Sequence, residues 1–373
     1  MSPSKLSEMK VVIVGCGFAG AQVASQLNGK CHLTVIDPRE YFHHCIGSPR
    51  AAVEAGFEKK ILIPLSKAWG DKFKQGKVRS IDPEKKVVIL EDGEEISYDF
   101  VVIATGSTSP FPGKIDLDVL TIAEAESHYK KLQEQINVAS KITVVGAGAV
   151  GVETAAEIAE DFPSKKVTVV TNADNVVGGP FKDKMRASIK NKLADLGVVL
   201  IFNEKVTNLD ELSTSSVGAC TVKTDKGTEI EADFVIVSTG MHVNTEIFQE
   251  KFGDKMDERK NIKVNQFLQV EGHEDVFAIG DCNNADSVKM ALKCEGQAQT
   301  VAKNIQALCG GKSLKPYKEV TDIIAVSLGR NGGAMQLKFM TFGSFVTSRL
   351  KSRDLFAGKQ WSLLNQKLPA NTK

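Results

Sequence analysis

The stretch KVVIVGCGFAGAQVASQLNGKCHLTVID, from Lys10 to Asp37, places a glycine turn and a helical pattern between two apolar runs. This order predicts a strand, a turn, a helix and a parallel strand that together bind a dinucleotide. Gly15 allows the tight turn, Gly17 lets the backbone approach a pyrophosphate, and Gly20 lets the helix pack on the strand. The helix N-terminus offers free N–H groups to the phosphates. Asp37, 22 residues after Gly15, is positioned to accept hydrogen bonds from a ribose 2′-hydroxyl.

The same pattern returns about 130 residues further along the chain. An apolar run at 141–145 precedes GAGAVG, in which Gly146, Gly148 and Gly151 take the three glycine positions, and a helical pattern and a second apolar run at 167–170 follow. Two such units are far more specific than one. They predict an α/β protein with two Rossmann-like dinucleotide-binding domains, followed by a small C-terminal α+β segment.

The second unit differs from the first where its second strand ends. Thr171 and Asn172 stand there, without the carboxylate that the first unit has at Asp37. A missing acid relaxes the preference for a plain 2′-hydroxyl, and no arginine is present to demand a 2′-phosphate, so we expect either NADH or NADPH. Glu153, two residues after Gly151, is a candidate to position a nicotinamide; the alternative is a carboxylate that interacts with the helix dipole.

Three buried strands end at sites suited to a cofactor. The runs FVVIATG (100–106) and FVIVSTG (234–240) both stop at Thr-Gly, and Thr105 and Gly106 are expected to lie beside a bound dinucleotide. The run VFAIGD stops at Asp281, which can hold a ribityl hydroxyl of a flavin or can simply be a turn residue. The helix expected over about 290–308 would direct its N-terminal dipole at a reduced flavin.

A loop after the first unit carries two adjacent histidines, His43 and His44, and then Arg50. No third metal ligand is nearby, so we expect no metal site here and interpret the loop as a cover over a cofactor or substrate pocket. Arg50 either contacts a cofactor phosphate or is a surface charge.

Composition places the chain among ordinary globular proteins, with 373 residues, a net charge of +1 and no general nucleic-acid signature. The charge is uneven, because residues 312–373 carry 11 basic and 3 acidic side chains. This basic segment suggests an anionic surface as partner, or alternatively a solvated face. The seven cysteines contain no C-x-x-C pair, which favours a reducing compartment without disulfides. No apolar run approaches the length of a membrane span.

The basic segment also carries an apolar stripe. Residues 322–328 and 335–342 are expected to form a hairpin around the turn RNGG. Beyond it, a helix is predicted whose stripe consists of Phe342, Phe345, Val346 and Leu350, flanked by Arg349, Lys351 and Arg353. The stripe either lies on a membrane surface or packs on the body of the protein.

Several longer motifs carry a family resemblance. They are FHHC (42–45), AAVEAGFEKK (51–60), ATGSTSPFPGK (104–114), VGVETAAEI (150–158), VEGHEDVFAIGDC (270–282), SLGRNGG (327–333) and KSRDLF (351–356). With the two glycine turns, they resemble the two-dinucleotide-binding-domain flavoprotein reductases, in particular the mitochondria-associated, apoptosis-inducing-factor-like members. The resemblance extends from about residue 11 to 361. It implies that the first domain holds FAD and the second holds NADH or NADPH.

The same resemblance implies an FAD-dependent NAD(P)H:quinone oxidoreductase. Ubiquinone and vitamin K-type quinones would be reduced to quinols that trap lipid radicals and so suppress lipid peroxidation and ferroptosis. Two alternatives stay open: a reductase of a small electron-carrier protein, and a flavin-regulated protein that binds a membrane, nucleic acid or a partner. A disulfide reductase is disfavoured because the sequence has no C-x-x-C dithiol relay.

The resemblance also assigns site residues and domains. FAD would be bound by Gly15, Gly17, Gly20, Asp37 and Asp281, and the nicotinamide nucleotide by Gly146, Gly148, Gly151 and Glu153. Lys351 would lie near the flavin, with Lys114 and His44 as weaker catalytic candidates beside Glu153. The expected domains are residues 1–112 with 242–312 for FAD, 113–241 for NAD(P)H, and 313–373 as a C-terminal hairpin and amphipathic-helix domain.

The expected location is cytoplasmic, peripheral on membranes or lipid droplets or on the outer mitochondrial membrane. Family members in mammals carry an N-terminal glycine that is myristoylated, whereas this chain has Ser2, so we expect the basic C-terminal segment to make the contact. Nucleic acid is the less favoured partner, and the oligomeric state is left open.

Overall fold

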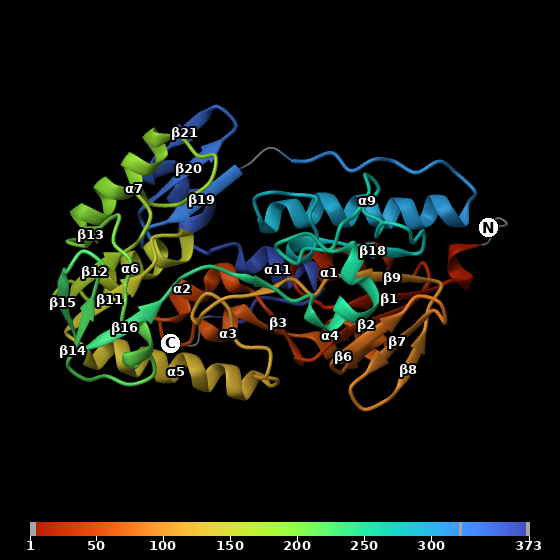
Figure 1. Ribbon diagram of the computed structural model, residues 1–373, viewed down its shortest axis with the longest axis horizontal. Helices are drawn as coiled ribbons and strands as arrows, with labels where there is room; N and C mark the ends of the chain where they lie inside the picture. The colour runs from red at the N-terminus through yellow and green to blue at the C-terminus, as the bar shows by residue number, and fades with distance from the viewer. Residues whose placement is uncertain (1–4, 321–322, 371–373) are drawn as a thin grey trace.

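The first domain is built on a five-stranded parallel sheet (Figure 1). The computed structural model describes residues 5–320 and 323–370; Ser2 and Asp322, which enter the expectations above, lie outside these residues. The strand order is β18 (Val276–Ala278), β9 (Phe100–Ile103), β1 (Lys10–Val14), β2 (His32–Asp37) and β5 (Phe73–Gln75). Because β18 pairs with β9, a late part of the chain completes a sheet that its first residues begin.

Side chains of β1 are buried on both faces of this sheet. Val11 and Ile13 enter a core made with two helices that pack against each other, whereas Val12 and Val14 enter a core made with a three-stranded antiparallel sheet. The covering elements are α1 (Phe18–Leu27), α9 (Ala291–Cys309), β6 (Val78–Asp82), β7 (Val87–Leu90) and β8 (Glu95–Ser97). Burial on both faces explains why the strand is a continuous apolar run without alternation.

The second domain repeats the plan with a four-stranded parallel sheet. Its order is β13 (Val199–Ile201), β12 (Lys166–Val170), β11 (Lys141–Val145) and β16 (Phe234–Val237). Three helices pack with it, α5 (Ile122–Val138), α6 (Ala149–Asp161) and α7 (Asp183–Asp195), and the hairpin β14 (Cys220–Lys223) and β15 (Glu229–Ala232) covers the other face. The N-terminus of α5 is fixed by a capping box in which Thr121 and Glu124 bond each other's backbone N–H groups.

Two short antiparallel strands mark the passage between the domains. β10 (Ser107–Thr108) leaves the first domain and pairs with β17 (His242–Val243), which returns to it. The remaining short elements are β3 (Tyr41–His43), α2 (Ser48–Ala51), α3 (Glu58–Ile61), β4 (Leu62–Pro64), α4 (Leu65–Trp69) and α8 (Gln249–Phe252). Within residues 5–320 and 323–370, no helix is both long enough and apolar enough to cross a membrane.

The C-terminal segment differs from its sequence-based prediction in two ways. The expected second strand of the hairpin is two strands, so the sheet consists of β19 (Ile323–Ser327), β20 (Gly333–Leu337) and β21 (Met340–Phe342). Phe342 therefore belongs to β21, and the helix that follows is short: α10 (Ser344–Thr347) continues into one π turn, Ser348–Ser352. The predicted four-residue stripe does not lie on one helix.

A final helix, α11 (Ala357–Leu363), was not predicted, and it changes the domain assignment. Trp361 and Leu364 belong to the core of the first domain, and α11 lies beside α1 (Figure 1). Val326 and Ala334, from β19 and β20, belong instead to the core of the second domain. Residues 323–370 therefore form a bridge between the two domains, and they are not a separate third domain.

Candidate functional site

The glycine turn of the first domain has the geometry that its sequence predicts. Gly15 has φ +97°, and a Cβ there would stand 2.5 Å from the carbonyl oxygen of Ala104, at the end of the neighbouring strand. A Cβ on Gly20 would stand 1.9 Å from the carbonyl oxygen of Gly15, so α1 can pack this closely only with glycine. Nothing lies within 4 Å of a Cβ on Gly17, which leaves open space at the uncapped N-terminus of α1. This open cradle fits a pyrophosphate.

The second turn repeats these features in the second domain. Gly146 has φ +113°, with the Ser238 carbonyl oxygen 2.5 Å from its would-be Cβ, and Gly151 would meet the Gly146 carbonyl oxygen at 2.0 Å. Gly148 again faces open space before α6, which has no side-chain cap. The chain therefore contains two dinucleotide cradles, each at the carboxyl end of a parallel sheet.

Asp37 is held against the first turn by two backbone groups. Its Oδ2 accepts a hydrogen bond from the Cys16 N–H at 2.7 Å and its Oδ1 accepts one from the Arg39 N–H at 3.0 Å. Strand register places Thr171 in the corresponding position, because Val14 pairs with Ile36 and Val145 pairs with Val170. The Thr171 hydroxyl likewise accepts a hydrogen bond from the N–H two residues later, on Ala173.

This equivalence gives a testable expectation for Thr171→Asp. A carboxylate in this position would accept hydrogen bonds from a ribose 2′-hydroxyl and repel a 2′-phosphate, so the kcat/KM ratio of NADH to NADPH should rise about 10-fold. Steady-state kinetics with both nucleotides measures it, and Thr171→Asn is the control, because it keeps an oxygen acceptor without a charge. An equal change in both variants would assign the effect to altered packing.

Near the first cradle, three residues that the sequence predicted for the site lie just beyond the carboxyl ends of β9 and β18. They are Thr105, Gly106 and Asp281. The Thr105 hydroxyl donates to the Asn244 carbonyl oxygen at 2.7 Å, and Asn244 N–H donates to the Gly106 carbonyl oxygen at 2.9 Å, so the exit is tied to the returning chain. Asp281 Oδ2 accepts hydrogen bonds from the Ser107 hydroxyl at 2.6 Å and from Lys114 Nζ at 3.1 Å. Lys114 and Asp281 are thus brought together as an ion pair.

Charge balance at Asp281 suits it for binding a hydroxyl. Burial acts to raise the pKa of this carboxyl, but Lys114 and the Ser107 hydroxyl outweigh that effect, and the pKa is lowered. The side chain is therefore an anion at neutral pH and can accept hydrogen bonds. A small hollow beside it is lined by Lys289 and the first turn of α9, whose N-terminus has no side-chain cap. The anionic Asp281 would suit a ribityl hydroxyl of FAD, and the N-terminus of α9 would suit negative charge on the flavin.

Glu153 and Lys351 form a buried ion pair that joins the second domain to the C-terminal segment. Lys351 Nζ lies 2.6 Å from Glu153 Oε1 and also donates to the Ala325 carbonyl oxygen at 2.7 Å. The same Glu153 oxygen accepts hydrogen bonds from the backbone N–H and the hydroxyl of Ser327, at 2.9 and 3.0 Å. Lys351 is 7 % exposed, so it is an internal partner of Glu153, a contact that the sequence did not predict.

The two histidines have different environments, although they are adjacent in sequence. His43 Nε2 lies 3.0 Å from the Tyr129 hydroxyl and 3.1 Å from the Ser48 hydroxyl, in a buried network between β3, α2 and α5. His44 is fully buried, and its Nε2 lies 2.7 Å from the Leu355 carbonyl oxygen. A carbonyl can only accept, so Nε2 carries the proton and Nδ1, which has no hydrogen-bond partner, is an acceptor. The His44 ring lies 5.8 Å from that of Phe18, at the first glycine turn.

His44 makes stability depend on pH. Burial lowers its pKa from 6.5 to about 4, against the opposing effect of the Leu355 hydrogen bond and with a smaller contribution from nearby Lys351. The unfolded chain therefore takes up a proton first, and the free energy of unfolding should fall by up to roughly 3 kcal/mol as pH drops from 6.5 to 4. His44→Gln keeps a donor to Leu355 and should remove this component, as urea unfolding across that pH range would show. Exposed His128→Gln should leave the pH profile unchanged.

Arg50 occupies a different place from the one predicted. Its guanidinium makes a two-pronged ion pair with Glu157 of α6, at 2.9 and 2.8 Å, and donates to the carbonyl oxygens of Ser352 and Arg353. Arg50 is only 1 % exposed. The predicted alternatives, a phosphate contact or a surface charge, are both corrected by these contacts: Arg50 links α2, α6 and the segment that carries Lys351.

Several residues of the site were not predicted. Ser107 and Ser327 hold the two candidate acids, Asp281 and Glu153, and Glu157 neutralises Arg50. Ser107 lies in the motif that follows Thr105-Gly106, which was the available signal for it. Ser327 and Glu157 also lie in quoted motifs, SLGRNGG (327–333) and VGVETAAEI (150–158), but Glu157 pairs with Arg50, which is far from it in sequence, as Ser327 is from Glu153.

All seven cysteines are free. Burial raises the pKa of every one of the seven thiols, so each resists forming a reactive thiolate. Among the residues that the structure describes, no group of three His, Cys, Asp or Glu side chains is arranged to hold a metal ion.

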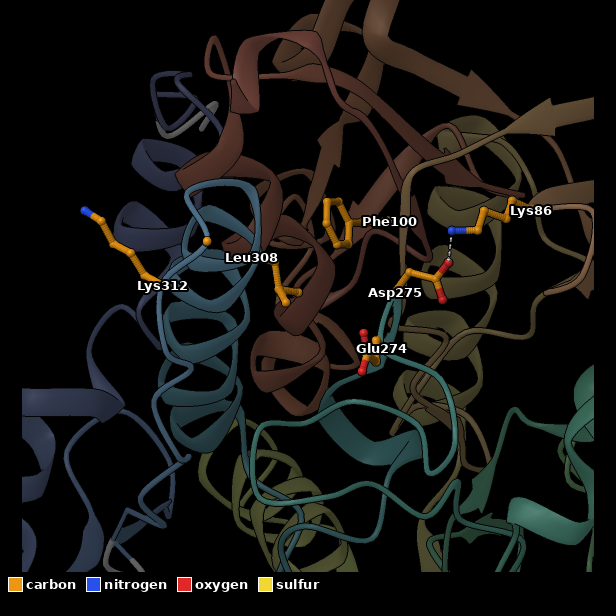
Figure 2. A pocket seen from close by; sticks show the side chains of 7 residues that line it. Lys86, Phe100, Glu274, Asp275, Leu308 and Lys312 are labelled. Atoms are coloured by element: carbon orange, nitrogen blue, oxygen red, sulfur yellow. Dashed lines mark ion pairs between the residues drawn. The ribbon is translucent and has the colours of Figure 1, made fainter. Parts of the chain in front are cut away.

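A cavity of about 350 Å³ lies away from both cradles (Figure 2). Lys86 and Asp275, which form an ion pair, line it together with Phe100, Leu308 and Lys312. Phe100 is the first residue of β9 and Asp275 immediately precedes β18, so this cavity is at the amino ends of the strands. Ligands of open parallel sheets bind at the carboxyl ends, where the glycine turns, Thr105 and Asp281 lie. The cavity is therefore not the candidate active site.

Comparison with known proteins agrees with this geometry. A family model described as pyridine nucleotide-disulphide oxidoreductase matches residues 9–305. Ferroptosis suppressor protein 1 of Taeniopygia guttata is 38 % identical over 364 residues, covering 97 % of this chain and 97 % of that protein. The protein of the same name from Homo sapiens is 36 % identical over 363 residues, with 97 % of each chain covered. Apoptosis-inducing factor homolog B of Dictyostelium discoideum is 36 % identical, covering 96 % of this chain and 98 % of that protein.

Solved structures share the fold at lower identity. The sulfide:quinone oxidoreductase from Aquifex aeolicus has a TM-score of 0.77 at 20 % identity, covering 97 % of this chain and 93 % of its own. A ferredoxin reductase from Rhodopseudomonas palustris has a TM-score of 0.69 at 19 % identity, with 96 % of each chain covered. These two similarities establish the arrangement of two dinucleotide-binding domains.

Proposed function

Because the chain belongs to the pyridine nucleotide-disulphide oxidoreductase family and is an FAD-dependent NAD(P)H oxidoreductase, we propose that its electron acceptor is a quinone. FAD, when bound, would supply the redox chemistry that connects NAD(P)H with a two-electron acceptor. The protein supplies binding, alignment and electrostatics.

The residues described above divide this task between the two cradles. Gly15, Gly17 and Gly20 would accommodate the FAD pyrophosphate and Asp37 its ribose, while Asp281, held by Ser107 and Lys114, would accept a hydrogen bond from the ribityl chain. The nicotinamide nucleotide would be bound at its pyrophosphate by Gly146, Gly148 and Gly151, and Glu153 would lie near its nicotinamide end.

The proposal that the electron acceptor is a quinone rests on the state of the cysteines. Disulfide reductases of this architecture pass electrons through a reactive thiol pair, which needs a low thiol pKa and a neighbouring cysteine. Here all seven thiols are free and all have raised pKa values. This disfavours a dithiol relay within the chain, and a quinone is an acceptor that could take two electrons without one.

Similarity to the ferroptosis suppressor proteins supports a physiological role for the product. Those proteins are 36–38 % identical to this chain over nearly its whole length. Quinols formed from ubiquinone or vitamin K-type quinones donate hydrogen atoms to lipid radicals. We therefore assign this protein a role in suppressing lipid peroxidation and, through it, ferroptosis.

Acceptor competition tests the proposal. The FAD-loaded protein would be supplied with NADH and then, in separate assays, with a short-chain ubiquinone, a vitamin K-type quinone, and a ferredoxin or rubredoxin. We expect turnover with the quinones to exceed turnover with the carrier proteins by at least about 100-fold in kcat/KM, because no dithiol or protein-docking relay is needed. Faster reduction of a carrier protein would contradict the proposal.

A further inference from the structure

A buried polar network lies between Asp281 and the chain that follows α9. Its centre is Asp286, which is 3 % exposed. Asp286 Oδ2 accepts a hydrogen bond from Gln297 Nε2 at 2.5 Å, and the Tyr317 hydroxyl lies 3.2 Å from Oδ1 and 3.0 Å from Oδ2. Lys293 Nζ, on the first turn of α9, lies 3.5 Å from Asp286 Oδ1. Buried networks of paired polar groups make the segments that they join rigid.

Gln297 connects this network to the turn that carries Asp281. Its Oε1 accepts hydrogen bonds from the Gly280 N–H at 2.7 Å and from Asn283 Nδ2 at 2.9 Å. A backbone N–H can only donate, so the amide oxygen of Gln297 faces the turn and its NH2 group faces away. Asp286 accepts on that other side, and it therefore fixes which way the Gln297 amide points. Gly280, with φ +79°, directly precedes Asp281, so a shift of its backbone moves the Asp281 carboxyl as well.

Residues 312–320, which we call the strap, hold Asp286 from the other direction. The strap has no helix or strand and runs along α9 (Figure 1). It is tied to that helix by two hydrogen bonds between Lys315 and Asn304, at 2.9 and 3.0 Å. Burial and, next in size, the charge of Asp286 raise the pKa of the Tyr317 hydroxyl. The hydroxyl therefore keeps its proton and donates it to the Asp286 carboxyl in a hydrogen bond.

We infer that Asp286 is a positioning residue for FAD, which orders the Gly280–Asp281 turn through Gln297 and is itself held by Tyr317 of the strap. Asp286 and Gln297 also line the small hollow beside Asp281. The strap thus contributes to FAD affinity, although it lies outside the glycine turn and does not carry the ribityl acid. This inference concerns how firmly FAD is retained, and it holds whichever electron acceptor the protein uses.

Release of FAD from the FAD-loaded full chain tests the inference. Dilution over a concentration series, followed by the fluorescence of free FAD, gives the dissociation constant without NAD(P)H or an acceptor. Asp286→Ala removes the acceptor that orients Gln297, and FAD should bind at least about 10-fold more weakly. Gln297→Leu leaves the Gly280 N–H without its acceptor and should weaken FAD binding by at least as much.

A double variant shows whether Asp286 acts through Gln297. FAD should bind to Asp286→Ala/Gln297→Leu no more weakly than to Gln297→Leu alone, because the first substitution has nothing further to disorder. If the two losses multiplied, Asp286 would act by another route, and the inference would be overturned.

Asp286→Asn separates positioning from the stability of the fold. Asparagine keeps an oxygen that can accept from Gln297 Nε2, so the FAD dissociation constant should stay within about threefold of its original value. The same change removes a negative charge beside buried Lys293, so the urea midpoint of the FAD-loaded protein should fall. Equal loss of FAD affinity in Asp286→Asn and Asp286→Ala would show that charge, and not the orientation of Gln297, matters, and would overturn the inference.

Tyr317→Phe tests the strap with the smallest change. It removes one hydroxyl that donates to Asp286, and the FAD dissociation constant should rise about fivefold. Tyr98→Phe is the matched control, because the buried Tyr98 hydroxyl has no hydrogen-bond partner among the described residues. Asp275→Ala is the control for Asp286→Ala, since Asp275 pairs with Lys86 at the opposite end of the same sheet. Both controls should retain FAD like the unchanged protein, and equal FAD affinity in either matched pair would overturn the inference.

Discussion

Replacing Lys351 with Met is expected to lower the rate of flavin reduction by NAD(P)H about 100-fold, because the change releases Glu153 from its fixed position. Glu153 accepts three hydrogen bonds on one oxygen, and Lys351 supplies the only charge among those three donors. The same substitution leaves a buried carboxylate without a counter-charge, which should also cost about 3–5 kcal/mol of stability. Stopped-flow absorbance at the flavin band measures the first effect, and urea unfolding measures the second.

The double variant Lys351→Met/Glu153→Gln separates the two effects. Glu153→Gln removes the unpaired charge but keeps an oxygen that can accept from Ser327, so stability should recover most of the loss. Flavin reduction should stay slow, because the charged pair that we propose to position the nicotinamide is still missing. Recovery of both stability and rate would show that the pair is only structural.

Arg50→Ala should destabilise the protein by about 3–5 kcal/mol. Glu157 would be left buried and unpaired, and burial already acts to raise its pKa against the effect of Arg50. The carbonyl oxygens of Ser352 and Arg353 would lose a charged donor at the same time. Urea unfolding of the flavin-loaded protein measures the loss.

A double variant that replaces both Arg50 and Glu157 gives a second test of this ion pair. Arg50→Met/Glu157→Leu replaces both charges with apolar groups and should be clearly more stable than Arg50→Ala. Lys74→Ala is the matched control, because Lys74 pairs with Glu94 at the surface, where both side chains are well exposed. That change should cost no more than about 1 kcal/mol. If Lys74→Ala and Arg50→Ala lowered the free energy of unfolding by similar amounts, burial would not explain the strength of the Arg50–Glu157 pair.

The two cradles could be predicted from sequence because their determinants are local. Gly15, Gly20, Gly146 and Gly151 each meet backbone within a single strand–turn–helix unit or at its adjoining strand, so spacing alone encodes the geometry. The contrast between Asp37 and Thr171 is also local, since each directly follows the last residue of its strand that pairs with the first strand of its unit. The fold class follows from the repetition of this unit.

The polar contacts between domains could not be predicted in the same way. Arg50 and Glu157 are 107 residues apart in sequence, and Lys351 and Glu153 are 198 apart. Such a pair has no spacing rule, because its geometry depends on how complete domains pack. Arg50 was consequently expected at a phosphate or at the surface, and no partner was predicted for Lys351.

The C-terminal segment shows a further limit of periodicity. Phe342, Phe345, Val346 and Leu350 fit a helical stripe, yet Phe342 belongs to β21 and α10 begins only at Ser344. Pairing of Met335 with Phe342 extends the sheet and overrides the helical pattern. Trp361 gave no periodic signal, although it completes the core beneath α1.

The central claim is that one chain carries out two half-reactions, and anaerobic reduction of the bound flavin tests it most directly. The FAD-loaded protein would be mixed with NADH or NADPH without oxygen, and the flavin absorbance followed before and after a short-chain ubiquinone is added. The account predicts bleaching by the nicotinamide nucleotide and full return of the absorbance on adding the quinone. Bleaching that the quinone does not reverse would contradict the proposed acceptor, and a flavin that neither nucleotide bleaches would contradict the assignment of the second cradle.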